Sequence, residues 1–352
     1  MVRRRRKLIP RGMKMFPPEY KRRGIREISK MYTDGFAAVW KDPEAEEELI
    51  EEIGLHGGWS DAADAAREFG IEESGKGKLS LAFLPMLELW STAVPGPAQG
   101  RGDCVAHSEK NANLLTLGAE IVSGKPDEVT GEFEGAPEIS DLAIAQGVLS
   151  TEAIYWWRDH GGDGWSCSHA SRVTLTESGL WLRKDYKDKF GFDLTKYSSS
   201  LAGRYGRTSP PNKIKEFGLL HVPRTATVCT GQKESVRDLL ANYYGISSCG
   251  SEAFVSKRDK YGFARRSGSW AHAMAYWAFD DRQWAYDTYG DAMVLVMNSW
   301  GHWNSGPRDI HDSAKYVPAA KRRLWIKLDI VNATTGNIKI PPGSFWAKTQ
   351  VI

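Results

Sequence analysis

The sequence predicts an α+β protein with two lobes, one helical and one rich in strands. Segments with helical periodicity come first, and segments rich in aromatic and branched residues follow them. Helices that precede strands along the chain favour the α+β class. The 352 residues, 41% of them hydrophobic, are enough to bury a large core.

Four segments have the pattern of helices. The second begins after Asp103, which we expect to be its N-cap, and the residues SGKP stop it. The expected helices are 43–70, 104–121, 170–185 and 233–245.

Four later segments have the pattern of strands. The expected strands are 271–279, 293–297, 324–328 and 345–351. The GKGK run at 75–78 is expected to be a linker. The predicted organisation is a basic arm (1–26), a short helical N-terminal extension (27–78) and a main domain (79–352), with a helical lobe over about 79–215 and a β-rich lobe over about 216–352.

The first 26 residues are strongly basic. They hold eleven Lys and Arg against one acid, Glu19, so the remainder of the chain is acidic although the net charge is +3. With three prolines and little helical periodicity, such an arm is disordered alone and binds polyanions or acidic surfaces. Three interpretations stay open: a solubilising tail, contact with nucleic acid, and docking in a larger protein assembly.

No apolar run approaches the roughly 20 residues that a membrane span needs, so no membrane partner is expected. The N-terminal charges are not followed by an apolar stretch, so no secretory signal is expected. The four cysteines, Cys104, Cys167, Cys229 and Cys249, are few for a disulfide-stapled secreted protein. We therefore expect them to be mostly reduced, in the cytoplasm, with a single Cys229–Cys249 disulfide left open.

A cysteine follows a glycine-rich loop in the segment QGRGDC, at the start of an expected helix. Unpaired N–H groups and the helix dipole lower the pKa of a thiol placed there, which makes Cys104 a candidate nucleophile. Gly100 and Gly102 allow a sharp turn and close approach of a substrate. The side-chain amide of Gln99 and the backbone N–H of Cys104 are candidate donors to an oxyanion.

A histidine and an asparagine occur at two of the expected strands. His272 lies in SWAHAM, and Asn298 follows the next strand in MNSWG, with Ser299 beside it. An amide oxygen can orient an imidazole so that its other nitrogen faces a sulfur. Trp300 can shield that hydrogen bond from water. The pattern predicts a Cys104–His272–Asn298 triad.

These segments, in this order, resemble the papain-like cysteine peptidases. The nucleophile segment of that family reads approximately QGxCGSCWAFS, against QGRGDCVAHS here, and its asparagine segment reads NSWGxxWGxxGY, against NSWGHWNSGP here. GGDGWSCSHASRVTLTESG and PPGSFWAKTQV resemble its glycine-rich turn and closing strand. The resemblance covers roughly 80–352. It implies a papain-like two-lobed fold with a barrel-like β lobe, and hydrolysis of peptide or amide bonds without a metal or cofactor.

The resemblance also implies roles for Gln99, Cys104, His272 and Asn298, with Trp300 as the shielding indole. The chain departs from the family pattern in four places. Gln99 and Cys104 are five residues apart where the family usually has six, Val105 replaces a tryptophan, and the disulfide cysteine of the loop is missing. The negative charge of Asp103 would oppose formation of the thiolate. Residues 27–78 do not match the inhibitory pro-segment of the family.

The ending of the chain also resembles papain-like proteins encoded by bacteriophages, which together with the basic arm implies a virion component. Two functions are therefore kept: a cysteine-dependent hydrolase of a peptide or protein substrate, and a structural or docking component of a virus particle with little or no activity. A third uses the same residues on cell-wall peptide. A zinc site on Cys104 and His107 with Cys167 and His169 is disfavoured, because its spacing is unusual and it would consume the nucleophile.

Overall fold

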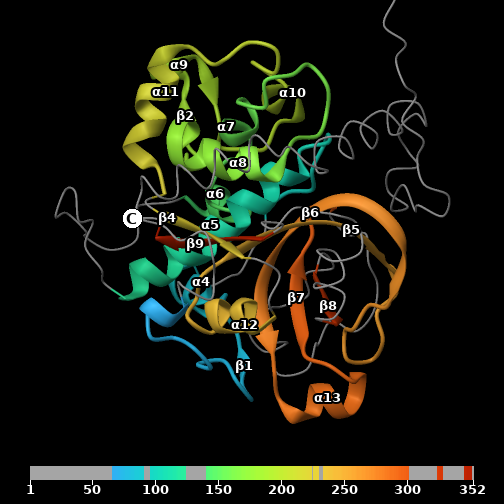
Figure 1. The fold of residues 1–352 in the computed structure, drawn as a ribbon. Coiled ribbons are helices and arrows are strands. Elements are labelled where there is room, and N and C mark those ends of the chain that lie inside the picture. Colours follow the sequence, from blue (N-terminus) through green and yellow to red (C-terminus); the bar gives the residue numbers. More distant parts are fainter. Residues whose placement is uncertain are drawn as a thin grey trace, which may run out of the picture.

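The computed structural model describes residues 66–90, 96–123, 140–223, 225–229, 233–300, 323–327 and 345–350. Within them, a group of helices lies on one side of the molecule and the strands of a large sheet lie on the other (Figure 1). This confirms the α+β class with a helical and a strand-rich lobe. The basic arm and most of the expected helix over 43–70 lie outside the described residues.

One long helix runs through the described part of the chain, and the others are short. The helices are α4 (Leu84–Trp90), α5 (Cys104–Ser123), α6 (Asp141–Ala145), α7 (Glu152–Tyr155), α8 (Cys167–Val173), α9 (Lys187–Phe190), α10 (Ser199–Ala202), α11 (Asn212–Gly218), α12 (Lys233–Ala241) and α13 (Gln283–Tyr289). A π-helical turn, η2 (Thr174–Ser178), follows α8, and a 3-10 turn, η3 (Leu219–His221), follows α11. The expected helix over 104–121 is confirmed as α5. The expected helix over 233–245 is confirmed as α12, which ends earlier, at Ala241.

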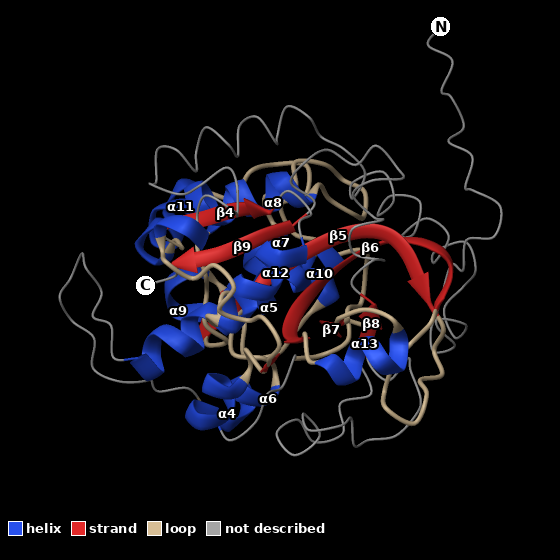
Figure 2. Cartoon of the chain, turned by 60° about the horizontal axis from the view of Figure 1, so that its bottom comes forward, coloured by secondary structure: helices blue, strands red, loops and turns tan. Residues whose placement is uncertain are grey.

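The strands of the large sheet are antiparallel and follow the order β4-β9-β5-β6-β7-β8 (Figure 2). Strand β1 pairs with β6 off this path. Their bounds are β1 (Leu79–Ser80), β4 (Thr225–Cys229), β5 (Ile246–Phe254), β6 (Arg266–Asp280), β7 (Met293–Met297), β8 (Arg323–Lys327) and β9 (Phe345–Gln350). A small separate sheet pairs β2 (Asp185–Tyr186) with β3 (Phe192–Asp193). The four expected strands are confirmed as β6, β7, β8 and β9, while β4 and β5 were not predicted. Closure into a barrel stays a prediction.

Helix α5 lies between the two lobes and is buried on all sides. Every residue from Cys104 to Gly118 is buried, and the helix packs against β5, β6 and β9 as well as α4 and α8. A helix enclosed in this way is usually apolar all round. Here α5 carries buried polar side chains, among them Glu109 and Asn113, which therefore need hydrogen-bond partners inside the protein.

The expected helix over 170–185 is wrong at both ends. It begins at Cys167, with Ser166 as N-cap, and its π-helical continuation ends at Ser178. Gly179 has φ +55°, a left-handed value, and a Cβ there would lie 2.0 Å from the carbonyl oxygen of Gly218. The close approach of these two glycines ends the helix. The chain then extends, and Leu182 forms an isolated antiparallel bridge with Leu149.

The core of the helical lobe is aromatic, in keeping with the 14 tryptophans of the chain. The buried Trp181 stands at its centre, with ring centroids 4.5–6.2 Å from those of five neighbours. Three of these pairs are edge-to-face and two are tilted, and such aromatic pairs add to the free energy of simple burial. The five neighbours are Trp156, Tyr186, Phe190, Phe192 and Phe217.

The expected linker at 75–78 is a turn that packs against α12 and β6. The Asp238 carboxylate accepts from the backbone N–H of Glu73 (2.9 Å) and Gly75 (3.1 Å). The Asp281 carboxylate accepts from the N–H of Gly77 at 2.8 Å. The segment therefore has fixed contacts with the strand-rich lobe, and the domain boundaries stay a prediction. No helix among the described residues has both the length and the apolar character needed to cross a membrane.

Candidate active site

Cys104 is the first residue of α5, and its thiol faces strand β6. The thiol receives a hydrogen bond from the backbone N–H of Ala273, the residue that follows His272. Burial raises the pKa of the Cys104 thiol to about 12, with a smaller upward contribution from Asp103, while N–H groups at the helix start lower it. Placing the cysteine at a helix N-terminus therefore does not by itself produce a thiolate here.

His272 and Asn298 meet across two neighbouring strands. In the antiparallel pairing of β6 with β7, Met297 lies opposite Ala275, so the residue after β7 lies beside the earlier part of β6. The distance from His272 Nε2 to Asn298 Oδ1 is 2.7 Å. Because an amide oxygen only accepts, Nε2 carries the proton and donates it, and Nδ1 is the nitrogen that would exchange a proton with a thiol.

The imidazole is enclosed. The Trp300 ring stacks on the ring of His272 at a centroid distance of 4.2 Å and an interplanar angle of 27°. Burial lowers the pKa of His272 to about 4, and the Asn298 hydrogen bond raises it only in part. Cys104 is 3% exposed, His272 2% and Asn298 0%. Both pKa shifts favour a neutral thiol beside a neutral imidazole.

Gln99 is bound to the residue after Asn298. Its backbone N–H donates to the Ser299 carbonyl (2.8 Å), and its Oε1 accepts from the Ser299 hydroxyl (2.5 Å). Its Nε2 donates to the carbonyl of Arg101 at 2.8 Å. An amide nitrogen has two hydrogens, so the oxyanion role predicted for Gln99 would use the second one. The predicted supporting residue Ser299 thus fixes the orientation of the amide.

The nucleophile loop is tied to the helical lobe. The carbonyl of Gly102 accepts from the N–H of Gly164 at 2.9 Å, and Arg101 Nε donates to Asp163 Oδ1 at 2.6 Å. A Cβ on Gly100 would lie 2.6 Å from Cβ of Ser199, so only glycine fits there. These contacts join the loop to the glycine-rich turn at 161–164.

Asp103 does not cap α5 with its side chain, contrary to the sequence prediction. Its Oδ2 accepts from the hydroxyl of Tyr197 (2.8 Å), which itself accepts from the N–H of Gly100 (2.8 Å). Its Oδ1 lies 3.8 Å from Nε2 of His107. Burial raises the pKa of Asp103 to about 7, so near neutral pH only part of the molecules carry the charge that opposes the thiolate. No motif in the sequence pointed to Tyr197.

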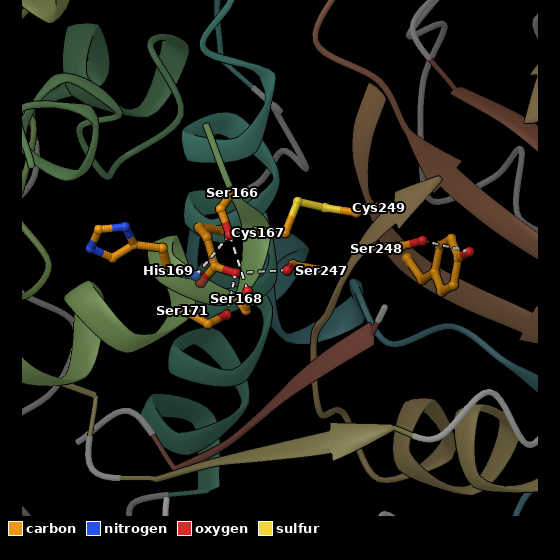
Figure 3. Close-up of a disulfide and its surroundings, with 10 residues drawn as sticks. Ser166, Cys167, Ser168, His169, Ser171, Ser247, Ser248 and Cys249 are labelled. Atoms are coloured by element: carbon orange, nitrogen blue, oxygen red, sulfur yellow. Dashed lines mark hydrogen bonds between the residues drawn. A yellow bond between two sulfur atoms is a disulfide. The ribbon is translucent and has the colours of Figure 1, made fainter. Parts of the chain in front are cut away.

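Cys167 and Cys249 form a disulfide (Figure 3). The expectation of mostly reduced cysteines is wrong for these two, and the bond excludes the Cys229–Cys249 pairing that the sequence left open. The disulfide also makes Cys167 unavailable to the disfavoured zinc site. The cysteines therefore no longer support the expected reducing, cytoplasmic location, because disulfides persist mainly in oxidising compartments. Cys104 is free, as a nucleophile requires.

No protein-family model matches this sequence, and no curated protein matches it. Solved structures that are similar to the chain include cysteine proteases from three organisms.

Xylellain, a cysteine protease from Xylella fastidiosa, is 13% identical, with a TM-score of 0.44 over 75% of this chain and 89% of that one. The cysteine protease and lectin-like domains of a surface-layer-associated protein of Clostridium difficile are 17% identical, with a TM-score of 0.39 over 76% of this chain and 51% of that one. Digestive procathepsin L2 proteinase from Tenebrio molitor larval midgut is 13% identical, with a TM-score of 0.48 over 96% of this chain and 83% of that one. At identities and TM-scores this low, the likenesses assign neither an activity nor a substrate to this chain.

Proposed function

We propose that the chain is a papain-like, cysteine-dependent hydrolase of peptide or amide bonds. Cys104 is the nucleophile, His272 the acid and base, and Asn298 the residue that orients the imidazole. One observation carries the proposal: His272, which is bonded to Asn298 at 2.7 Å, is followed directly by Ala273, whose backbone N–H donates to the thiol of Cys104. A base held by an amide beside a nucleophile is the arrangement that acyl transfer needs.

The reaction proceeds in two halves. The proton of Cys104 moves to Nδ1 of His272 as the sulfur attacks the carbonyl carbon, and the N–H of Cys104 and the amide of Gln99 donate to the developing oxyanion. The imidazolium returns its proton to the leaving amine, and a thioester remains. Water then attacks the thioester and gives a proton to His272, the acid is released, and the proton returns to the sulfur.

The electrostatics of the resting site bear on the first step. The raised pKa of Cys104 and the lowered pKa of His272 disfavour a preformed thiolate–imidazolium pair. Proton transfer therefore accompanies attack on the substrate. Since both side chains are almost fully buried, a substrate reaches the sulfur only after the site opens.

The experiment is covalent labelling with a peptidyl fluoromethyl ketone, followed by mass spectrometry to locate the labelled cysteine. We expect labelling at Cys104 that His272→Ala abolishes. Cys229→Ser is the matched control and should label like the natural protein. Labelling that survives His272→Ala, or that falls on Cys229, would contradict the assignment of the base or of the nucleophile.

A second proposal concerns the arm and is supported by the separation of charge: residues 1–26 are strongly basic and the remainder is acidic. In it, the chain is a docking or structural component of a particle, such as that of a bacteriophage, and the arm binds nucleic acid or an acidic protein surface. Polyanion binding that weakens steeply with salt and is lost on removal of residues 1–26 supports this role. Equal binding by the shortened chain would exclude it.

A further inference from the structure

A buried carboxyl group joins three elements at the boundary between the lobes. Oε1 of Glu109, on α5, accepts from the hydroxyl of Ser171 on α8 (2.6 Å) and from that of Ser247 on β5 (2.7 Å). All three residues are almost fully buried. Glu109 lies five residues after Cys104 on the same helix, so these bonds anchor the helix that carries the nucleophile.

A disulfide connects two of the same elements a short distance away. Cys167 lies at the start of α8 and Cys249 on β5, with Cα atoms 6.5 Å apart, and Figure 3 shows the bond beside Ser171 and Ser247. In the pairing of β5 with β6, Cys249 lies opposite Ala273 and its neighbour Gly250 opposite His272. The disulfide therefore attaches the helical lobe to the strand next to the base.

We propose that Glu109, Ser171, Ser247 and the Cys167–Cys249 disulfide, here called the Glu109 junction, position His272 against Cys104, and that the disulfide makes this positioning sensitive to reductant. Cys104 comes from α5 and His272 from β6, so their separation depends on how the helix docks on the sheet. A misplacement of about 1 Å can cost about 10²-fold in rate. The inference rests on the proposed function for its turnover readout only.

The carboxyl group of Glu109 sets how α5 docks on β5, which an apolar side chain that only filled the same space would not do. Two hydroxyls converge on one oxygen, which fixes both the rotation of α5 and its height over β5. An apolar side chain would leave those hydroxyls without their acceptor, and it would permit neighbouring registers of the helix. Reduction by a dithiol breaks the S–S bond, leaves two thiols and oxidises the dithiol to its cyclic disulfide.

The first test compares Glu109→Gln with Glu109→Leu. The amide oxygen of glutamine can still accept from both hydroxyls, whereas leucine cannot. We expect Glu109→Leu to lower both the alkylation rate of Cys104 by iodoacetamide and kcat by about tenfold or more, with KM little changed. Glu109→Gln should stay within about threefold of the natural protein, by the same reasoning.

The matched control is Asn113→Ala, on the same helix. Asn113 is also fully buried, but its side chain donates only within α5, to the backbone carbonyl of Glu109 at 2.8 Å. If Asn113→Ala lowers the alkylation rate of Cys104 as much as Glu109→Leu does at equal thermal stability, the junction has only a structural role and the proposal fails.

The second test is redox. The protein is reduced with dithiothreitol and desalted, the state of each cysteine is determined by mass spectrometry, and alkylation of Cys104 is then timed. Reduction should slow alkylation about tenfold, and the Cys167→Ser/Cys249→Ser double variant should be equally slow and insensitive to the dithiol. Cys229→Ser, the matched control, should keep the sensitivity.

The outcomes separate this inference from the proposed function. Unchanged alkylation of Cys104, once Cys167 and Cys249 are shown to be reduced, overturns the junction even if peptides are cleaved. A response of alkylation to both Glu109→Leu and reduction, without cleavage of any peptide, supports the junction and counts against the hydrolase.

Discussion

The imidazole of His272, on β6, and the amide of Asn298, the residue after β7, are joined by a 2.7 Å hydrogen bond although they lie 26 residues apart. The bond fixes which ring nitrogen carries a proton, and the stacked ring of Trp300 covers it. Ser299, the residue after Asn298, donates its hydroxyl to the side chain of Gln99 in the nucleophile loop. This bond ties the segment that carries Asn298 to the loop that carries Cys104. The two strands and the loop thus form one connected unit.

Asn298→Ala removes the acceptor that orients the ring. We expect labelling of Cys104 by the peptidyl ketone to slow by about 10²-fold, because the imidazole can then rotate away from the sulfur. His272→Ala should abolish it. The circular dichroism spectrum of Asn298→Ala should match that of the natural protein, and a labelling rate that does not change would show that the asparagine does not orient the base.

The contact of His272 with Asn298 and Trp300 could be expected from the sequence because each residue stands in a short motif. The catalytic roles of these residues stay a prediction. The partners of Asp103 and Glu109 could not be expected. Tyr197 is 94 residues from Asp103, and Ser247 is 138 from Glu109. Such pairs arise only when distant segments of the chain pack together, and no local pattern marks them.

The strands also differ in how well a local pattern predicts them. Strand β7 was predicted with its observed bounds, because MVLVM is apolar and branched throughout. Strand β5, ISSCGSEAF, was missed, since it is made largely of small and polar residues. It is a strand because β6 and β9 pair with it on either side. Tertiary pairing has overridden a weak local preference.

Trp300→Ala should raise the pKa of His272. Burial is the main cause of the present value of about 4, and loss of the indole admits water to the ring. The change can be followed by titrating the imidazole resonances by NMR. Trp284→Ala, which removes a partly exposed indole from α13, is the matched control. A pKa that stays near 4 in Trp300→Ala would mean that other groups exclude the water.

Glu152→Ala should destabilise the helical lobe strongly. Arg183 and Glu152 are both 0% exposed, with Nη1 2.7 Å from Oε2, and the loss of one partner leaves the other charge buried alone. We expect the free energy of unfolding, measured with denaturant, to fall by about 3–5 kcal/mol.

Lys76→Ala is the control for that measurement. It removes an ion pair to Glu73 whose side chains are 60% and 67% exposed, and such pairs contribute little. A loss in Glu152→Ala no larger than that in Lys76→Ala would contradict the view that the buried pair stabilises the lobe.

Asp103→Asn should change how stability depends on pH. Burial raises the pKa of Asp103 from its ordinary 3.8 to about 7, so between these values the folded protein binds the proton more tightly than the unfolded chain. The contribution of this group to stability is complete below pH 3.8 and is lost as the pH rises to about 7. Asparagine does not titrate and escapes that loss.

The variant should therefore gain stability relative to the natural protein as the pH rises from 4 to 7, by roughly 3 kcal/mol in all, after which the difference levels off. His272, with its lowered pKa, produces the opposite slope between pH 4 and 6.5, but it does so in both proteins and cancels in the comparison. Denaturant unfolding at several pH values measures the difference.

The same substitution removes a negative charge beside the thiol, so alkylation of Cys104 should begin at a lower pH in the variant. Parallel stability curves would contradict this prediction, because they would mean that Asp103 has the same pKa in the folded protein as in the unfolded chain and that burial does not hold its proton. An unchanged alkylation profile would show that the charge of Asp103 does not act on the thiol.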